Sequence, residues 1–200
     1  SMAVPVGAAG ACAEGVGKQG ADAVVAEGME SGGHIGETTT MNLVPRVADA
    51  VKIPVIAAGG IADGRGMAAA FMLGASGVQM GTRFVCASEC NAHVNYKEKI
   101  VKANDRATVV TGRSLGHPVR ALKNKFTKQF EELEGRNAPA AELEALGAGK
   151  LRLAVVEGDS DMGSFMSGQS AGLVHAIEPA ASIIESVVTQ MESILSGSER

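Results

Sequence analysis

The chain has 200 residues, 46% hydrophobic and 20% charged, which suits a globular domain that buries an apolar core. Its net charge of −4 gives no electrostatic reason to expect nucleic acid or an anionic membrane as a partner. No apolar run approaches the roughly 18 residues of a membrane span. The three cysteines form no CxxC pair and favour neither a disulfide framework nor a zinc site. We therefore expect no metal centre and a reducing, cytoplasmic setting.

Four short apolar runs in the first half predict strands that are covered on both faces. They are residues 4–6, 23–26, 54–58 and 77–80. Helix-like stretches separate them at 9–20, 41–51 and 66–73, and in the second of these Leu43, Val44 and Val47 recur at helical spacing. This βαβαβαβ order predicts an α/β fold with a parallel sheet or barrel.

The pattern changes after residue 84, where charged helical stretches predominate. We predict helices over 91–103 and 118–133, with a brief extended segment at 108–111 between them. Apolar residues recur every three or four positions from Val119 through Phe126 to Leu133, and Pro118 suits a first helical position. Pro179 opens a final helix that ends before Gly197. The second half is therefore predicted to be a helical subdomain.

Glycine clusters follow the predicted strands, at 28–36, at Gly59-Gly60 and at Gly81-Thr82. Parallel α/β folds place their active sites at the carboxyl ends of strands. Consecutive glycines let backbone N–H groups approach a phosphate oxygen, and Thr82 adds a hydroxyl donor. The alternative is that Gly59-Gly60 only makes a tight turn.

Three rival motifs fail on inspection. Residues 59–64 do not fit G-x-G-x-x-G, and Gln19 replaces the Ser/Thr that a P-loop requires after Gly17-Lys18. The stretch from Asp159 to Gly163 begins like a calcium loop, but Ser170 stands where the bidentate Glu belongs. Neither a dinucleotide fingerprint, a P-loop nor a calcium site is therefore indicated.

Three motifs in order carry a family resemblance: AEGMESGGHIG at 26–36, IPVIAAGGI at 53–61 and GVQMGTRF at 77–84. Together they resemble the superfamily of nitronate monooxygenases and FMN-dependent enoyl-acyl-carrier-protein reductases. The stretches at 116–124 and 168–174 look more like its reductase branch, enoyl-acyl-carrier-protein reductase II.

The resemblance implies a TIM-type β/α barrel, of which this chain carries about the last four β/α units and a helical subdomain. We accordingly expect the C-terminal half of an FMN-binding barrel at 1–90, and a helical cap with C-terminal helices at 91–200. Four strands cannot close an eight-stranded barrel. We therefore expect a homodimer that pairs two half-barrels, or an upstream half that is supplied separately.

The resemblance also implies the site residues. His34 would be catalytic, by orienting a flavin, donating a proton or holding a substrate carbonyl; the alternative is a loop histidine that only rigidifies. The expected FMN contacts are Glu27, Gly32, Gly33, Gly59, Gly60, Gln79, Met80, Gly81 and Thr82. Glu27 and Gln79 could instead be ordinary polar residues at strand ends.

The implied reaction is the reduction of a trans-2-enoyl thioester on acyl-carrier protein, with NAD(P)H as co-substrate; a monovalent-cation requirement stays open. A basic stretch, Arg113, Arg120, Lys123, Lys125 and Lys128, is either a solvated face or a recognition surface for acyl-carrier protein or nucleotide phosphates. The alternatives are nitronate oxidation and a non-catalytic half-barrel fragment that keeps only flavin affinity or an association surface. An IMP-dehydrogenase-like enzyme would need a cysteine in the loop at 28–40, which has none.

Overall fold

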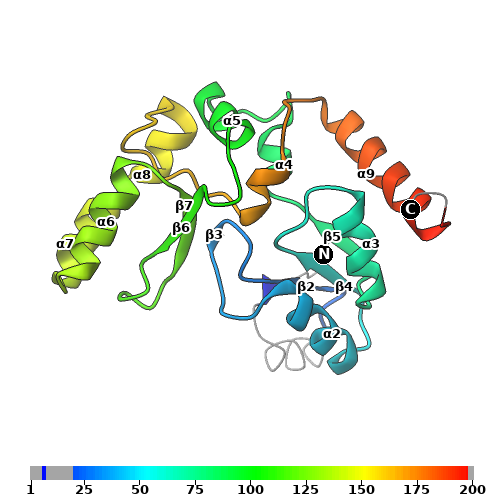
Figure 1. Cartoon of the computed structure of the whole chain (residues 1–200). Helices are drawn as coiled ribbons and strands as arrows, with labels where there is room; N and C mark the ends of the chain where they lie inside the picture. Colours follow the sequence, from blue (N-terminus) through cyan, green and yellow to red (C-terminus); the bar gives the residue numbers. More distant parts are fainter. Residues whose placement is uncertain (1–5, 8–19, 198–200) are drawn as a thin grey trace. The chain divides into compact units, whose positions relative to one another are not determined.

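A computed structural model describes residues 6–7 and 20–197 of the chain. These residues divide into two compact units (Figure 1). The first unit contains 6–7, 20–31, 35–80 and 180–197, and the second contains 32–34 and 81–179. The predicted helix at 9–20 lies almost wholly outside the described residues.

The first unit is built on a four-stranded parallel sheet. Its strands are β1 (Val6–Gly7), β2 (Val24–Glu27), β4 (Val55–Ala58) and β5 (Gly77–Gln79), in the order β1-β2-β4-β5. Helices connect β2 to β4 and β4 to β5, and all four strands pair in parallel, which confirms the α/β class and the parallel sheet predicted from the apolar runs. All four carboxyl ends point to the same edge.

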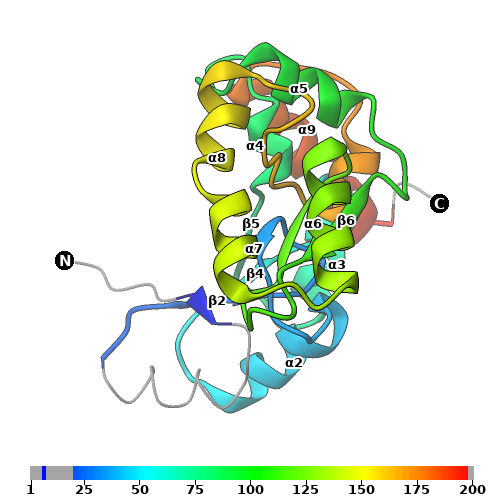
Figure 2. The same cartoon turned by 90° about the vertical axis from the view of Figure 1, so that its left-hand side faces the viewer.

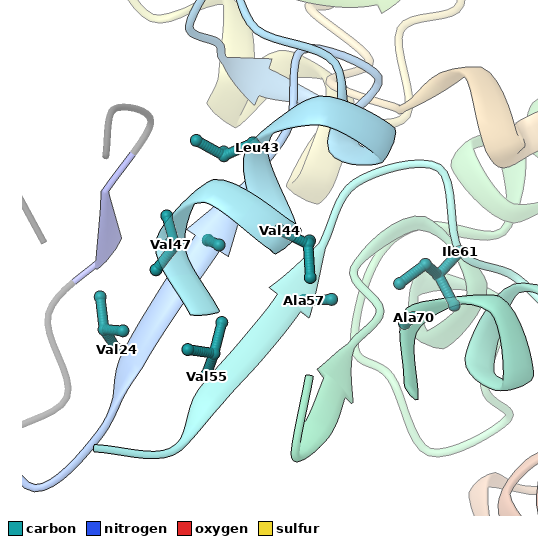
Figure 3. Close-up of a cluster of buried hydrophobic side chains, with 9 residues drawn as sticks. Val24, Leu43, Val44, Val47, Val55, Ala57, Ile61 and Ala70 are labelled. Carbon is teal, nitrogen blue, oxygen red and sulfur yellow. The ribbon is translucent and has the colours of Figure 1, made fainter. Parts of the chain in front are cut away.

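Helix α2 (Thr40–Ala50) covers one face of this sheet. It buries Leu43, Val44 and Val47 against Val24 and other side chains of β2 and β4, as Figure 3 shows. The helical spacing of these three residues, predicted from sequence, is confirmed. Burying each aliphatic side chain stabilises the fold by roughly 1.5–3 kcal/mol.

Two further helices of the first unit pack against each other. Helix α3 (Gly64–Met72) follows β4, and α9 (Ala180–Leu195) comes from the far end of the sequence. The contact is close because a Cβ on Gly64 would lie 2.5 Å from the backbone nitrogen of Met191. The Gln190 side chain accepts a hydrogen bond from the Gly64 N–H, so the C-terminal helix caps α3.

The second unit has its own three-stranded antiparallel sheet, ordered β3-β7-β6. Strands β6 (Thr108–Thr111) and β7 (Val119–Leu122) form a hairpin, and β3 (Gly33–His34) adds to the outer edge of β7. The extended segment predicted at 108–111 is confirmed, but the helix predicted over 118–133 is wrong at its start. Val119 and Leu122 share helical spacing with later residues, yet both backbone edges of this segment are paired with strands.

The helix of this region, α6 (Lys125–Gly135), begins only after Asn124. The Asn124 side chain accepts from the Thr127 N–H, and the Thr127 hydroxyl accepts from the Asn124 N–H. This capping box fixes the start of the helix. Phe126 and Phe130 still form its apolar face, which packs with Leu143. Leu143 belongs to α7 (Ala140–Gly147), and Figure 2 shows the ribbons of α6 and α7.

The remaining elements of the second unit are short. They are α4 (Thr82–Val85), α5 (Val94–Val101), α8 (Lys150–Arg152), the π-helical turn η1 (Leu153–Glu157) and the 3₁₀ turn η2 (Gln169–Leu173). Helices predominate here, as predicted, but the β3-β7-β6 sheet was not foreseen. The expected domains at 1–90 and 91–200 stay a prediction. Within the described ranges, no helix is both long and apolar enough to cross a membrane.

Candidate functional site

In the first unit, the predicted FMN contacts lie at the carboxyl ends of three neighbouring strands. Glu27 ends β2 and Gln79 ends β5, and both stand in register with Ala58, the last residue of β4. Met80 follows Gln79, and Gly59 and Gly60 follow Ala58. The parallel register therefore places these residues side by side along one edge of the sheet.

The backbone at Gly59 and Gly60 needs glycine. Their φ angles are +93° and +75°, in the left-handed region that side chains disfavour. A Cβ on Gly59 would also lie 2.8 Å from the carbonyl oxygen of Gly28. The loop after β4 therefore packs directly on the backbone that follows β2.

A polar network that the sequence did not reveal joins the loops after β2 and β4. The Glu30 carboxylate accepts hydrogen bonds from the Thr40 N–H at 2.9 Å and from the Thr40 hydroxyl at 2.9 Å. The same hydroxyl lies 3.0 Å from the Gly59 carbonyl oxygen. A Cβ on Gly28 would stand 2.0 Å from that hydroxyl, so glycine is required there as well.

In the second unit, the predicted residues Gly32, Gly33 and His34 contact a different segment. Gly32 packs on the backbone of Ser167, where an added Cβ would lie 2.6 Å away. Gly33 has φ +79° and pairs with Arg120, and the exposed His34 pairs with Val119. Strand β3 therefore presents His34 from the edge of a sheet and not from a free loop.

Thr82 and Gly81 belong to the second unit too. The Thr82 hydroxyl is buried and accepts a hydrogen bond of 2.9 Å from the Gly168 N–H. Within the described residues its own proton has no acceptor, so the hydroxyl can donate to a ligand. A Cβ on Gly81 would have no heavy atom within 4 Å among the described residues, apart from its chain neighbours.

Residues 165–168 contact both the segment with Gly32 and Gly33 and the hydroxyl of Thr82. The sequence predicts no site role for them. The hydroxyl of Tyr96 donates to the Met166 carbonyl at 2.6 Å, and the Leu122 N–H donates to the Phe165 carbonyl at 2.9 Å. Burial raises the pKa of Tyr96 to about 12, so it stays a phenol donor at neutral pH. The Met166 sulfur would lie 3.5 Å from a Cβ on Gly33.

The basic stretch predicted at 113–128 does not form one open cationic face. Arg120 is buried and donates to the Thr108 hydroxyl. Lys125 forms an ion pair with Asp161 at 2.6 Å, and Lys128 approaches Glu132 at 3.9 Å. Arg113 and Lys123 are exposed, and recognition of acyl-carrier protein or nucleotide phosphates by this stretch stays a prediction.

Packing accounts for Cys86 and a turn accounts for the calcium-like stretch, while Cys12 lies outside the described residues. Cys86 is fully buried, and burial raises the pKa of its thiol to about 11, which leaves it protonated and unreactive. The Asp159 carboxylate accepts from the backbone N–H groups of Asp161 and Met162. No cluster of three or more His, Cys, Asp or Glu residues suited to a metal occurs in the part of the chain that the structure describes.

Comparison with known proteins gives the family. The sequence profile of the nitronate monooxygenase family matches residues 2–190, a range that includes every candidate site residue. The chain belongs to the nitronate monooxygenase family. A curated relative, a probable nitronate monooxygenase of Staphylococcus aureus, is 36% identical over 89% of this chain and 53% of its own length.

Solved structures of this family extend the comparison. FabK from Thermotoga maritima is 55% identical, with a TM-score of 0.95 over 98% of this chain and 63% of the FabK chain. Nitroalkane oxidase from Streptomyces ansochromogenes is 29% identical, with a TM-score of 0.83 over all of this chain and 60% of its own. The chain thus spans about half the length of the curated relatives it matches, and under two thirds of these structures.

Proposed function

We propose that this chain is part of an FMN-dependent enoyl-acyl-carrier-protein reductase that uses NAD(P)H. The similarity to FabK, an enoyl-acyl-carrier-protein reductase II, at 55% identity over nearly the whole chain is the observation that carries this proposal. The reductase-like stretches at 116–124 and 168–174 support it. In this reaction a hydride from NAD(P)H goes to the β-carbon of the enoyl thioester and a proton goes to the α-carbon.

The residues present fit a phosphate-bearing flavin. In the first unit, the positive φ angles of Gly59 and Gly60 turn the backbone at the end of β4, and the buried hydroxyl of Ser31 finds no hydrogen-bond partner within the described residues. In the second unit, space is open beside Gly81, and the Thr82 hydroxyl keeps a proton to donate. Exposed backbone N–H groups and free hydroxyl donors are what a phosphate monoester requires.

Bound FMN would supply the two-electron transfer between NAD(P)H and substrate. We propose that the residues after β4 and β5, namely Gly59, Gly60, Gly81 and Thr82, hold the phosphate. Glu27, Gly32, Gly33, Gln79 and Met80 would contact the rest of the cofactor. His34, held on β3 by its pairing with Val119, would orient the substrate carbonyl or donate the proton at its Nε2 or Nδ1 atom.

We further propose that the β1-β2-β4-β5 sheet is the C-terminal half of an eight-stranded barrel. Four parallel strands in sequential order fit this assignment, as does the 53% coverage of the curated relative. The other half would come from the rest of a longer protein or from a second copy of this chain. From the same resemblance we also propose a cytoplasmic location, acyl-carrier protein as the partner and a requirement for a monovalent cation.

Nitronate oxidation by molecular oxygen is the second candidate, favoured by the family profile and by the similarity to nitroalkane oxidase. A chain of this length could also be a non-catalytic fragment that binds flavin or only associates with a partner. The two catalytic candidates share the flavin and differ in the electron acceptor, so substrate tests separate them.

The test uses the full-length protein that carries this chain, loaded with FMN. We expect NAD(P)H oxidation on addition of crotonyl thioester, and a loss of kcat of about 100-fold or more in His34→Ala, as for removal of a general acid. His175→Ala, another exposed histidine, should keep wild-type kcat. Oxygen consumption with a nitronate and no NAD(P)H would instead identify a nitronate monooxygenase. Protein that never retains flavin would favour the non-catalytic fragment.

A further inference from the structure

The carboxylate of Glu30 closes the loop between β2 and α2. The Met29 N–H donates to the Thr38 carbonyl at 2.8 Å, which brings the two ends of the loop together. The side chain of Thr39, the residue that precedes α2, makes no capping hydrogen bond to that helix. The Glu30 carboxylate takes this role instead, through both of its oxygens, at 3.1 and 2.9 Å from the Thr40 nitrogen.

This arrangement explains how a carboxylate is tolerated beside the glycines proposed to bind phosphate. The N-terminus of a helix carries a partial positive charge and unpaired N–H groups, both of which stabilise an anion. The N-terminus of α2 therefore stabilises the Glu30 carboxylate through the Thr40 N–H. The Cβ of Glu30 lies 3.3 Å from the position that a Cβ on Gly60 would take, so the aliphatic part of the Glu30 side chain lines the loop after β4.

The Thr40 hydroxyl connects the Glu30 carboxylate to the loop after β4. Its single proton can be donated to one of three acceptors, namely a Glu30 oxygen at 2.9 Å, the Gly59 carbonyl at 3.0 Å or the Ala58 carbonyl at 3.3 Å. The hydroxyl fills the place that side chains on Gly28 and Gly59 would occupy. One side-chain pair thus contacts the backbone after two neighbouring strands.

We propose that Glu30 is a positioning residue, which acts with Thr40 to fix the loop after β2 against the Gly59-Gly60 loop in the conformation that binds the flavin phosphate. This inference rests on the proposed function. It assigns to Glu30 no contact with substrate or flavin. The loop that it fixes continues, four residues later, to His34.

The direction in which the FMN affinity changes in Glu30→Gln distinguishes positioning from simple electrostatics. Glu30→Gln removes a negative charge beside a site for an anionic phosphate, so charge alone would tighten FMN binding. It also replaces one accepting oxygen with an NH2 group, which can only donate and cannot accept from the Thr40 hydroxyl. We expect the second effect to win and FMN to bind at least tenfold more weakly, equivalent to about 1.4 kcal/mol.

The chain provides a matched control in Glu134. Its carboxylate also clamps a loop, accepting from the Gly112 N–H at 3.2 Å, the Ser114 N–H at 3.1 Å and the Ser114 hydroxyl at 2.7 Å. Glu134→Gln disturbs the same kinds of hydrogen bond in the turn between β6 and β7 of the second unit, and none of these bonds involves a residue proposed to bind FMN. It should change the FMN dissociation constant by less than twofold. Thr40→Val should weaken binding as Glu30→Gln does, and Thr40→Ser should restore it to within threefold.

The experiment measures FMN dissociation constants by fluorescence titration of the full-length protein, and amide hydrogen exchange of its flavin-free form. Glu30→Gln should speed exchange at 28–31 and also at 58–60, whereas Glu134→Gln should leave both segments unchanged. Unchanged or tighter FMN binding in Glu30→Gln, or exchange altered at 28–31 alone, would overturn the proposal. If the wild-type protein takes up no FMN, the proposed function fails, and the exchange result still decides whether Glu30 joins the two loops.

Discussion

At the scale of single residues, Asp63 shows how the strand-end loops pass into helices. It follows the Gly59-Gly60 loop and is the N-cap of α3, with its Oδ1 accepting from the Arg65 N–H at 3.0 Å and the Gly66 N–H at 3.3 Å. Burial alone would raise the pKa of this carboxyl, but hydrogen bonds from Arg65 and Gly66 outweigh it and lower the pKa below its ordinary 3.8.

Asp63→Ala should therefore lower the free energy of unfolding by about 1 kcal/mol at neutral pH, the usual value of a helix cap. Because the folded pKa is depressed, this contribution is present above the unfolded pKa and is lost as the pH falls through the folded pKa. The gap between wild type and variant should stay constant above about pH 5 and shrink below about pH 4. Urea unfolding at a series of pH values measures it, and a gap that persists at pH 2 would contradict the assignment.

Individual site residues differ in how far their roles could be predicted from sequence. The special backbone at Gly59 and Gly60 was foreseen, because paired glycines after an apolar run have a local cause. Glu30 and Thr40 were not, since their importance comes from hydrogen bonds across ten residues and to a neighbouring strand end. Gly28 appeared as one glycine of a cluster, and only the packed hydroxyl of Thr40 shows why no side chain fits there.

At the scale of elements, the packing of α3 on α9 has little tolerance for added volume. A Cβ on Gly64 would meet backbone atoms of α9, with the Val187 carbonyl oxygen at 2.6 Å and the Met191 nitrogen at 2.5 Å. A backbone obstacle cannot rotate away as a side chain can. The two helices would therefore have to separate to accept an alanine.

Gly64→Ala should cost about 1–3 kcal/mol of stability, the range for overpacking a core, despite the better helix propensity of alanine. Gly135→Ala is the matched control, since it lies in helix α6 with no heavy atom of the described chain within 4 Å of its would-be Cβ, its near neighbours aside. That change should be neutral or stabilising by up to about 1 kcal/mol. Thermal unfolding of both variants tests this, and equal melting temperatures would show that α9 does not pack as described.

Elements that depend on a local sequence pattern could be predicted, whereas an element that depends on pairing with distant residues could not. Strands β2, β4 and β5 could be predicted, because each is a continuous apolar run between glycine-rich loops. Strand β7 could not, since Val119 and Leu122 also fit a helical stripe and its partner β3 lies some 85 residues earlier in the chain. Pairing with β3 and β6 on both edges outweighs the local pattern.

At the scale of the whole molecule, we propose reductase activity for the full-length protein. The residues proposed to bind FMN lie at strand ends in the first unit, and at β3 and the start of α4 in the second. The flavin is common to both catalytic candidates, so the electron acceptor must decide. The chain spans 53% of its curated relative, and the decisive measurement therefore belongs to the full-length protein.

That measurement is the stoichiometry of NAD(P)H oxidation under anaerobic conditions, with FMN-loaded full-length protein and a trans-2-enoyl thioester. An enoyl-acyl-carrier-protein reductase should form one saturated thioester for each NAD(P)H consumed, with oxygen absent throughout. NAD(P)H that is oxidised only after oxygen is admitted, with the enoyl thioester recovered unchanged, would contradict the proposed reductase.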